Sequence, residues 1–184
     1  MSYPFLNDAI EPFACVQTFT PEECNEIIQI GQKDLKESLV LGAAGKSEFN
    51  SMRDSRTKGI PPSDENEWIY KRLSDSAQEL NNRFFGFDLF GFTEFLQFAQ
   101  YEVGGKYDPH VDCIYHGRIR KLSISVQLGE DYEGGSLVVT SDLVMPKTTG
   151  MAIAFASTTI HSVQPVTSGT RYSLVGWITG PRFK

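Results

Sequence analysis

The stretch "HVDCIYHGRIRKLSISVQL", residues 110–128, places a histidine and an aspartate one residue apart, directly before the most regular strand pattern of the chain. Side chains two positions apart on an extended segment point the same way, so His110 and Asp112 can present an imidazole and a carboxylate to one centre. A pair of this kind also occurs as an ordinary surface hydrogen bond. The two residues therefore indicate half of a metal site.

A later histidine can complete the set. His161 lies in "IHSVQPV", residues 160–166, a strand-like run that an antiparallel sheet can bring back beside the first pair. Two imidazoles and one carboxylate on a barrel wall are the donor set favoured by non-haem Fe(II), and they leave coordination positions open. The remaining histidine, His116, is interpreted as a loop residue rather than a ligand.

From residue 92 onward the hydrophobic period is two, and short turns separate the apolar runs. Many short strands at this spacing predict a closed or two-sheet antiparallel structure, a barrel or jelly roll. The predicted fold class is α+β, with the helices packed on one outer face of the strands. The candidate strands are "FTEFLQFAQYEV", "KLSISVQL", "SLVVT", "MAIAFA", "IHSVQPV" and "RYSLVGWI".

Two helices are predicted in the first half of the chain. In "TPEECNEIIQIGQKDL", residues 20–35, Thr20 can serve as the N-cap and Glu23 completes a capping box. A second helix is predicted in residues 63–85, where Asp64 can act as the cap and apolar residues recur at three- to four-residue spacing.

The stretch between these helices, residues 41–63, is rich in glycine, serine and charge and has no sustained period, which predicts a mobile or functional loop. A chain of 184 residues is long enough to bury one core. We therefore expect one domain over residues 1–184, with helical support over about 1–90 and a jelly-roll core over about 91–184.

Composition excludes several classes of protein. With 17 basic and 23 acidic residues the net charge is −6, which argues against a nucleic-acid binder. The three cysteines follow no CxxC spacing, so neither a disulfide framework nor a thiolate zinc site is expected. No signal peptide or membrane span is recognised, and a cytoplasmic protein without a membrane partner is the expectation.

An arginine offers an anchor for an organic ligand. Arg171 stands ten residues after His161, on a predicted strand whose alternate positions include Ser173 and Trp177. If that face looks inward, the guanidinium is buried and needs a carboxylate, which a dicarboxylate co-substrate would supply. If the face looks outward, Arg171 pairs with a surface acid, and strand parity alone leaves both readings open.

At this point the residues carry a family resemblance. "YEVGGKYDPHVD", "GGSLVV", "PKTTGMAIAF" and "HSVQPVTSGTRYSLVGW" together resemble the iron- and 2-oxoglutarate-dependent dioxygenases, most of all the prolyl 4-hydroxylase group. The resemblance covers roughly residues 93–180 and implies a double-stranded β-helix, that is, a jelly roll. It also implies that His110, Asp112 and His161 bind Fe(II), with 2-oxoglutarate and O2 as co-substrates and ascorbate as reductant.

The same resemblance assigns the co-substrate pocket. It implies that Arg171 binds the 5-carboxylate of 2-oxoglutarate, that Ser173 completes an Arg-x-Ser pattern, and that the hydroxyl of Tyr101 reaches the same carboxylate. Trp177 matches a tryptophan that lines this pocket.

Substrate contacts are less defined. "EFNSMRDSRTKG", residues 48–59, loosely resembles a loop that folds over peptide substrate in prolyl hydroxylases. The candidates for substrate contact are Tyr107, Arg120 and Arg53, and for each of them the alternative is an ordinary surface residue.

The implied activity is hydroxylation of an unactivated C–H bond, with peptidyl proline as the expected target and succinate and CO2 as by-products. A protein or peptide is the expected partner. One alternative is a 2-oxoglutarate dioxygenase that acts on another protein side chain or on a small molecule. A second alternative is a non-catalytic jelly-roll module that holds zinc or binds a sugar, although structural zinc sites take all four ligands from the protein.

Overall fold

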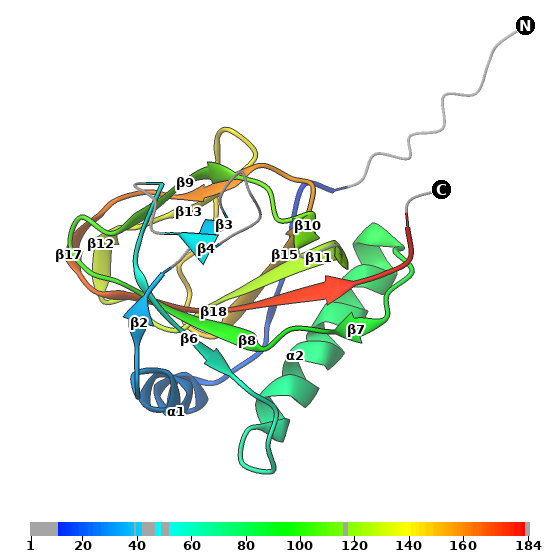
Figure 1. Ribbon diagram of the computed structural model, residues 1–184, viewed down its shortest axis with the longest axis horizontal. Coiled ribbons are helices and arrows are strands. Elements are labelled where there is room, and N and C mark those ends of the chain that lie inside the picture. The colour runs from blue at the N-terminus through cyan, green and yellow to red at the C-terminus, as the bar shows by residue number, and fades with distance from the viewer. Residues whose placement is uncertain (1–10, 39, 42–46, 49–51, 116–117, 183–184) are drawn as a thin grey trace, which may run out of the picture.

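Two antiparallel sheets face each other, and two helices lie outside the larger one (Figure 1). The structure, a computed structural model, describes residues 11–38, 40–41, 47–48, 52–115 and 118–182. The helical elements are α1 (Pro21–Gly31), α2 (Glu67–Leu80) and the π-helical turn η1 (Asn81–Phe85). The strands are β1 (Ala14–Gln17), β2 (Lys36–Glu37), β3 (Val40–Leu41), β4 (Ser47–Glu48), β5 (Arg53–Asp54), β6 (Arg56–Ile60), β7 (Gly91–Phe92), β8 (Leu96–Tyr101), β9 (Lys106–His110), β10 (Ile114–Tyr115), β11 (Arg118–Gln127), β12 (Tyr132–Gly134), β13 (Leu137–Val139), β14 (Leu143–Val144), β15 (Met151–Ala156), β16 (His161–Val163), β17 (Val166–Gly169) and β18 (Arg171–Thr179).

The larger sheet has the order β1-β15-β11-β18-β8-β6-β2, with β10 beside β11 and β7 beside β18. The smaller sheet has the order β14-β13-β16-β9-β5. All of the described pairings in both sheets are antiparallel. The long strand β11, which carries residues 118–127 of the quoted stretch, lies inside the larger sheet between β15 and β18.

The core has two layers, and strand periodicity separates them. Phe98, Leu122 and Leu174 belong to a cluster shared with both helices, on the outer face of the larger sheet. Their neighbours Ala99 and Phe155 belong to a second cluster, which also contains residues of the smaller sheet. Because successive side chains of a strand alternate between faces, the polar residues between the apolar ones of β11 point into the space between the sheets.

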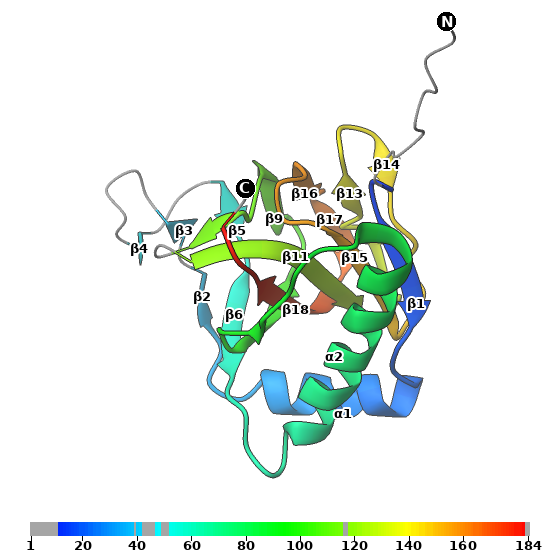
Figure 2. The ribbon, with the colours of Figure 1, turned by 90° about the vertical axis from the view of Figure 1, so that its right-hand side faces the viewer.

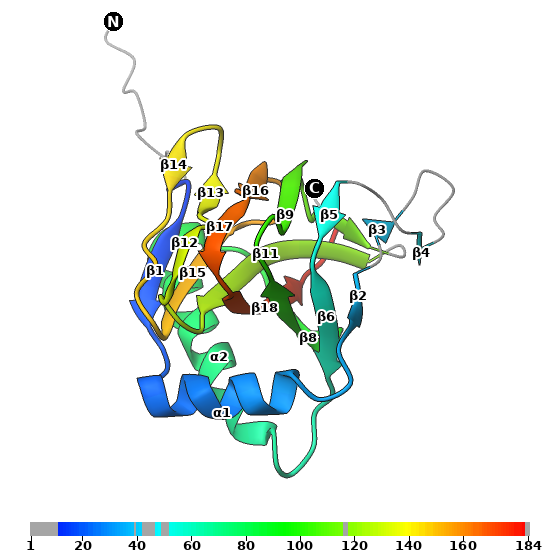
Figure 3. The ribbon, with the colours of Figure 1, turned by 90° about the vertical axis from the view of Figure 1, so that its left-hand side faces the viewer.

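Helix α1 begins where the sequence predicts. Thr20 is its N-cap, with the Thr20 Oγ1 accepting from the Glu23 amide at 3.3 Å and the Glu23 carboxylate accepting from the Thr20 amide at 2.9 Å. The helix packs on β6 and β8, and α2 packs on β1 and β15. Figures 2 and 3 show both helices on the same side of the larger sheet.

The start of the second helix differs from the prediction. The cap position is Asn66 rather than Asp64, and its side chain makes no capping hydrogen bond. The amide of Asn66 bonds to the carbonyl of Ser63 at 2.9 Å, which forms a turn ahead of the helix. The Asn66 side chain donates to the carbonyl of Pro61, so the local turn uses the side chain that could otherwise cap.

The expected loop over residues 41–63 is partly strand. Strand β6 pairs with β8 in the larger sheet, and β5 pairs with β9 in the smaller one. The first ninety residues therefore contribute strands to both sheets as well as the helices. None of the helices in the described part of the chain is long and apolar enough to span a bilayer.

Candidate metal and co-substrate site

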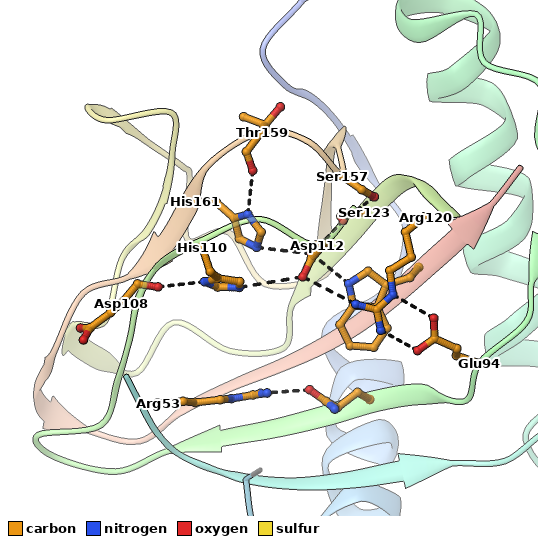
Figure 4. Close-up of polar contacts among 12 residues, drawn as sticks. Arg53, Glu94, Asp108, His110, Asp112, Arg120, Ser123, Ser157, Thr159 and His161 are labelled. Atoms are coloured by element: carbon orange, nitrogen blue, oxygen red, sulfur yellow. Dashed lines mark hydrogen bonds and ion pairs between the residues drawn. The ribbon is translucent and has the colours of Figure 1, made fainter. Parts of the chain in front are cut away.

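Strands β9 and β16 bring the three candidate ligands together. His161 and His110 are direct register partners in this antiparallel pair, and Asp112 follows β9 by two residues. One ligand atom from each of the three side chains lies within 4.8 Å of the others. The antiparallel return that the sequence suggested is therefore present, and the imidazole of His161 points toward the other two ligands (Figure 4). His116, interpreted as a loop residue, lies outside the described residues.

Backbone carbonyls orient both imidazoles. The Nδ1 atom of His110 lies 2.8 Å from the carbonyl of Asp108, and Nδ1 of His161 lies 3.0 Å from the carbonyl of Thr159. A carbonyl only accepts, so a ring in its neutral form carries its proton on Nδ1, and the lone pair of its Nε2 is available to a metal ion beside Asp112. Burial, and then the neighbouring imidazole of His161, lowers the pKa of His110 to about 4, which keeps His110 neutral at pH 7.

The carboxylate of Asp112 is buried and held by several donors. The Oδ2 atom accepts from the Ser123 hydroxyl at 2.8 Å and from the Trp177 indole at 2.9 Å. Burial raises the pKa of Asp112, but the two histidines, Trp177 and Arg120 outweigh it, so the pKa lies below its usual value. The side chain is therefore an ionised oxygen donor.

A salt bridge between Arg120 and Glu94 lies next to the Asp112 carboxylate. Arg120 donates to both oxygens of Glu94, at 2.8 and 2.5 Å, and its guanidinium lies 4.0 Å from the centroid of the Trp177 ring. The third nitrogen of the Arg120 guanidinium, Nη1, approaches Oδ1 of Asp112 at 3.8 Å. Arg120 is 6% exposed. This candidate for substrate contact is thus engaged by protein groups on the side of Asp112.

The three ligands suit a metal ion with open coordination positions. The set offers two neutral nitrogen donors and one anionic oxygen donor, and no fourth histidine, cysteine or acid joins it among the residues that the structure describes. This composition fits divalent iron better than a closed structural zinc site, which is filled by four protein ligands.

Arg171 faces inward. It is 1% exposed, and its Nη1 donates to Ser173 at 3.2 Å. Tyr101 is its register partner on β8, and the guanidinium carbon lies 5.2 Å from the centre of that ring. No carboxylate pairs with Arg171 within the described ranges, and its Nε is buried without a partner. The reading in which it pairs with a surface acid is wrong, and the buried cation fits an anionic ligand.

Tyr107 packs on His110, and Arg53 packs on Tyr107. The Tyr107 ring stacks on the imidazole of His110 with the ring centroids 3.6 Å apart. The guanidinium carbon of Arg53 lies 4.7 Å from the centre of the Tyr107 ring. The guanidinium of Arg53 also donates to Ser55 and Gln97, both at 2.9 Å. Burial raises the pKa of Tyr107, although Arg53 opposes the effect. These two candidates for substrate contact thus lie beside the candidate metal ligands.

Arg53 also lines a polar pocket that contains none of the three ligands. Its volume is about 500 Å³, and it carries charges of both signs. The lining residues are Glu37, Ser38, Arg53, Asp54, Ser55, Arg56, Gln100, Glu102 and Lys106.

Sequence reasoning missed several residues of the site. Glu94, Ser123 and Gln127 were not singled out, although the last two alternate with Leu122, Ile124 and Val126 on β11. Polar residues at every second position of a buried strand were an available signal for an inner polar face. Glu94 carried no such signal, because it meets Arg120 only through the fold.

Together, fold and site define a jelly-roll protein with two histidines and one carboxylate as candidate metal ligands. Residues 96–179 match the family model of the 2OG-Fe(II) oxygenase superfamily. This part of the chain, which contains the three candidate ligands and Arg171, is similar to that superfamily.

Curated relatives are similar to part of this chain in sequence. A PKHD-type hydroxylase of Acaryochloris marina is 42% identical over 89 residues, which cover 45% of this chain and 41% of the relative. Another, from Picosynechococcus, is 39% identical with the same coverage. The match thus spans about two fifths of the length of these relatives.

The structural neighbours share the fold at low identity. A Pseudomonas putida prolyl-4-hydroxylase superposes with a TM-score of 0.70 at 18% identity, covering 93% of this chain and 94% of the other. The viral collagen prolyl hydroxylase of Paramecium Bursaria Chlorella virus-1, in its 2OG complex, gives 0.69 at 21% identity, covering 93% and 97%. A prolyl hydroxylase from Trichoplax adhaerens in complex with a hypoxia inducible factor peptide fragment gives 0.70 at 16%, covering 91% and 83%. The predicted jelly roll is confirmed.

Proposed function

We propose that this protein is an Fe(II)- and 2-oxoglutarate-dependent dioxygenase that hydroxylates peptidyl proline. The observation that carries the proposal is the combination of a buried cluster, His110, Asp112 and His161, with a fully buried arginine that has no carboxylate partner among the described residues. A non-catalytic zinc module would need no such arginine. A buried, uncompensated guanidinium is destabilising unless an anion joins it.

The protein's own residues have distinct roles in this proposal. His110, Asp112 and His161 hold the iron, and Asp112 is kept ionised and in place by Ser123 and Trp177. Arg171, with Ser173 and Tyr101 beside it, binds the distal carboxylate of 2-oxoglutarate. When bound, the iron with 2-oxoglutarate and O2 supplies the oxidising chemistry that converts a C–H bond to C–OH and releases succinate and CO2.

The substrate assignment is supported by position and by the relatives. Tyr107 and Arg53 lie beside the metal ligands and can contact a peptide there, whereas Arg120 stands behind Asp112. The Trichoplax neighbour is a prolyl hydroxylase in complex with a peptide fragment. Ascorbate is proposed as the reductant that keeps iron divalent. An alternative within the same chemistry is hydroxylation of a different protein side chain or of a small molecule.

A peptide library tests the proposal. The protein is incubated with proline-containing peptides, Fe(II), ascorbate and 2-oxoglutarate, and products are sequenced by mass spectrometry for the gain of one oxygen atom. The proposal expects the gain on proline, with one succinate formed for each oxygen incorporated. The Asp112→Asn variant, which removes the anionic ligand, is the control and should form neither product. Oxygen gained only on other residues selects the alternative substrate class, and no succinate with any peptide argues against an oxygenase.

A further inference from the structure

Two buried nitrogen donors lack partners between the sheets. Among the described side chains that are not exposed, only Gln127 Nε2 and Arg171 Nε are buried nitrogen or oxygen atoms without a hydrogen bond. Gln127 is 0% exposed, so bulk water cannot satisfy its amide. Buried donors are nearly always paired in folded proteins, and those that are not call for an explanation.

The two donors lie on the same face of neighbouring strands. Gln127 on β11 is the register partner of Ser173 on β18, and Arg171 stands two residues before Ser173. Residues two apart on a strand share a face, so Gln127 and Arg171 are diagonal neighbours in the space between the sheets. Long side chains at such positions reach the same ligand.

Tyr132 determines which end of the Gln127 amide is left unpaired. Its hydroxyl donates to Gln127 Oε1 at 3.4 Å, which uses the acceptor and leaves the Nε2 donor. The ammonium of Lys147 lies 4.5 Å from the centre of the Tyr132 ring and donates to the carbonyl of Gly134 at 2.6 Å. Burial raises the pKa of Tyr132, and the charge of the nearby Arg171 opposes the effect.

We propose that Gln127 is a second donor to the carboxylate held by Arg171, and that Tyr132 is the positioning residue that presents the Gln127 amide. This inference rests on the proposed function, because the ligand is the distal carboxylate of a 2-oxo diacid. A carboxylate accepts hydrogen bonds at both oxygens, so it can satisfy the two unpaired donors at once. The neutral amide adds a hydrogen bond without adding charge, and the guanidinium and the carboxylate then balance each other.

Binding rather than turnover tests the assignment. Fe(II)-loaded protein is titrated by calorimetry without oxygen, once with 2-oxoglutarate and once with 2-oxopentanoate, which has a methyl group in place of the distal carboxylate. Gln127→Met should raise the Kd for 2-oxoglutarate about 10-fold or more, as expected for loss of a hydrogen bond to a charged group. The Kd for 2-oxopentanoate should change little. The exposed Gln78→Met, on α2, is the matched control and should leave both values unchanged.

A second variant covers the case in which Gln127→Met does not fold. Gln127→Glu places a carboxylate beside Arg171 and should raise the melting temperature of the ligand-free protein while abolishing 2-oxoglutarate binding.

For Tyr132, the expected result is that the effects of the Tyr132 and Gln127 substitutions on 2-oxoglutarate binding are not additive. Tyr132→Phe should weaken 2-oxoglutarate binding in the wild-type background but not in Gln127→Met, because it acts through the amide. An equal effect in both backgrounds overturns the positioning role.

The outcomes separate this inference from the proposed function. Wild-type protein that binds 2-oxoglutarate no better than 2-oxopentanoate contradicts both. If wild type discriminates and Arg171→Met does not, but both Gln127 variants bind 2-oxoglutarate as wild type does, the arginine anchor stands and the glutamine assignment is overturned.

Discussion

The indole nitrogen of Trp177 donates a hydrogen bond of 2.9 Å to Oδ2 of Asp112, a residue 65 positions earlier in the chain. The Ser123 hydroxyl donates to the same oxygen. These donors fix the plane of the carboxylate and leave Oδ1 as the less engaged oxygen. The resemblance in sequence had assigned Trp177 to the co-substrate pocket, and the structure adds a contact to a candidate metal ligand.

Trp177→Phe should weaken metal binding. The change removes the N–H donor but keeps an aromatic ring beneath Arg120. Loss of such an outer hydrogen bond lowers metal affinity by about 10- to 100-fold. Anaerobic titration of the metal-stripped protein with Fe(II) measures the effect. Trp68→Phe is the control, because Trp68 packs edge-on against Phe19 away from the three ligands. Unchanged affinity in Trp177→Phe contradicts a positioning role.

Arg171→Met should separate stability from co-substrate binding. The substitution replaces a buried cation that has no carboxylate partner in the described structure with an apolar side chain of comparable length. Removing an uncompensated buried charge is neutral or stabilising, so the melting temperature of the ligand-free protein should hold or rise. Added 2-oxoglutarate should stabilise the wild type but not the variant, because a ligand stabilises only the state that binds it. A large fall in the ligand-free melting temperature would show that protein groups compensate the guanidinium.

Glu94→Gln should destabilise the fold. Both side chains of the Glu94–Arg120 pair are about nine-tenths buried, with exposures of 11% and 8%. Removing one partner of a buried pair costs about 3 to 5 kcal/mol because the other charge is left behind. Urea unfolding measures this loss, and adding Arg120→Met should recover part of it. The control is Glu79→Gln, which breaks an exposed pair with Arg83 and should cost about 0.5 kcal/mol or less. Equal losses for the two glutamate variants would mean that the Glu94 pair is no stronger than a surface one.

The cysteines should differ in reactivity. Burial, together with the charge of Glu23, raises the pKa of Cys24 to about 11, so very little thiolate forms at pH 8. Cys15 is exposed. In the native protein a disulfide reagent should therefore label Cys15 quickly and Cys24 only after unfolding. The Cys15→Ala and Cys24→Ala variants assign the phases, and a fast phase that disappears in Cys24→Ala contradicts the expected burial of that thiol.

Local patterns in the sequence predicted the elements that depend on near neighbours. The Thr20–Glu23 capping box is confirmed because both partners lie within one helical turn. The strand predicted over "KLSISVQL", residues 121–128, is likewise confirmed, as β11 over Arg118–Gln127. The cap at Asp64 is wrong because a competing turn uses the preceding residues. Strands β5 and β6 inside residues 41–63 were missed because they pair with β9 and β8. Pairing partners far along the chain leave no local signal.

The sequence by itself determined which side chains share a face, because strand geometry fixes the alternation. It grouped Arg171 with Ser173 and Trp177, and His110 with Asp112. Only the tertiary structure decided which face is inside, since that depends on what packs against each side of the sheet. The register of β16 on β9 brings His161 to His110, and the contacts of Asp112 with Trp177 and of Gln127 with Tyr132 exist only once distant strands have paired.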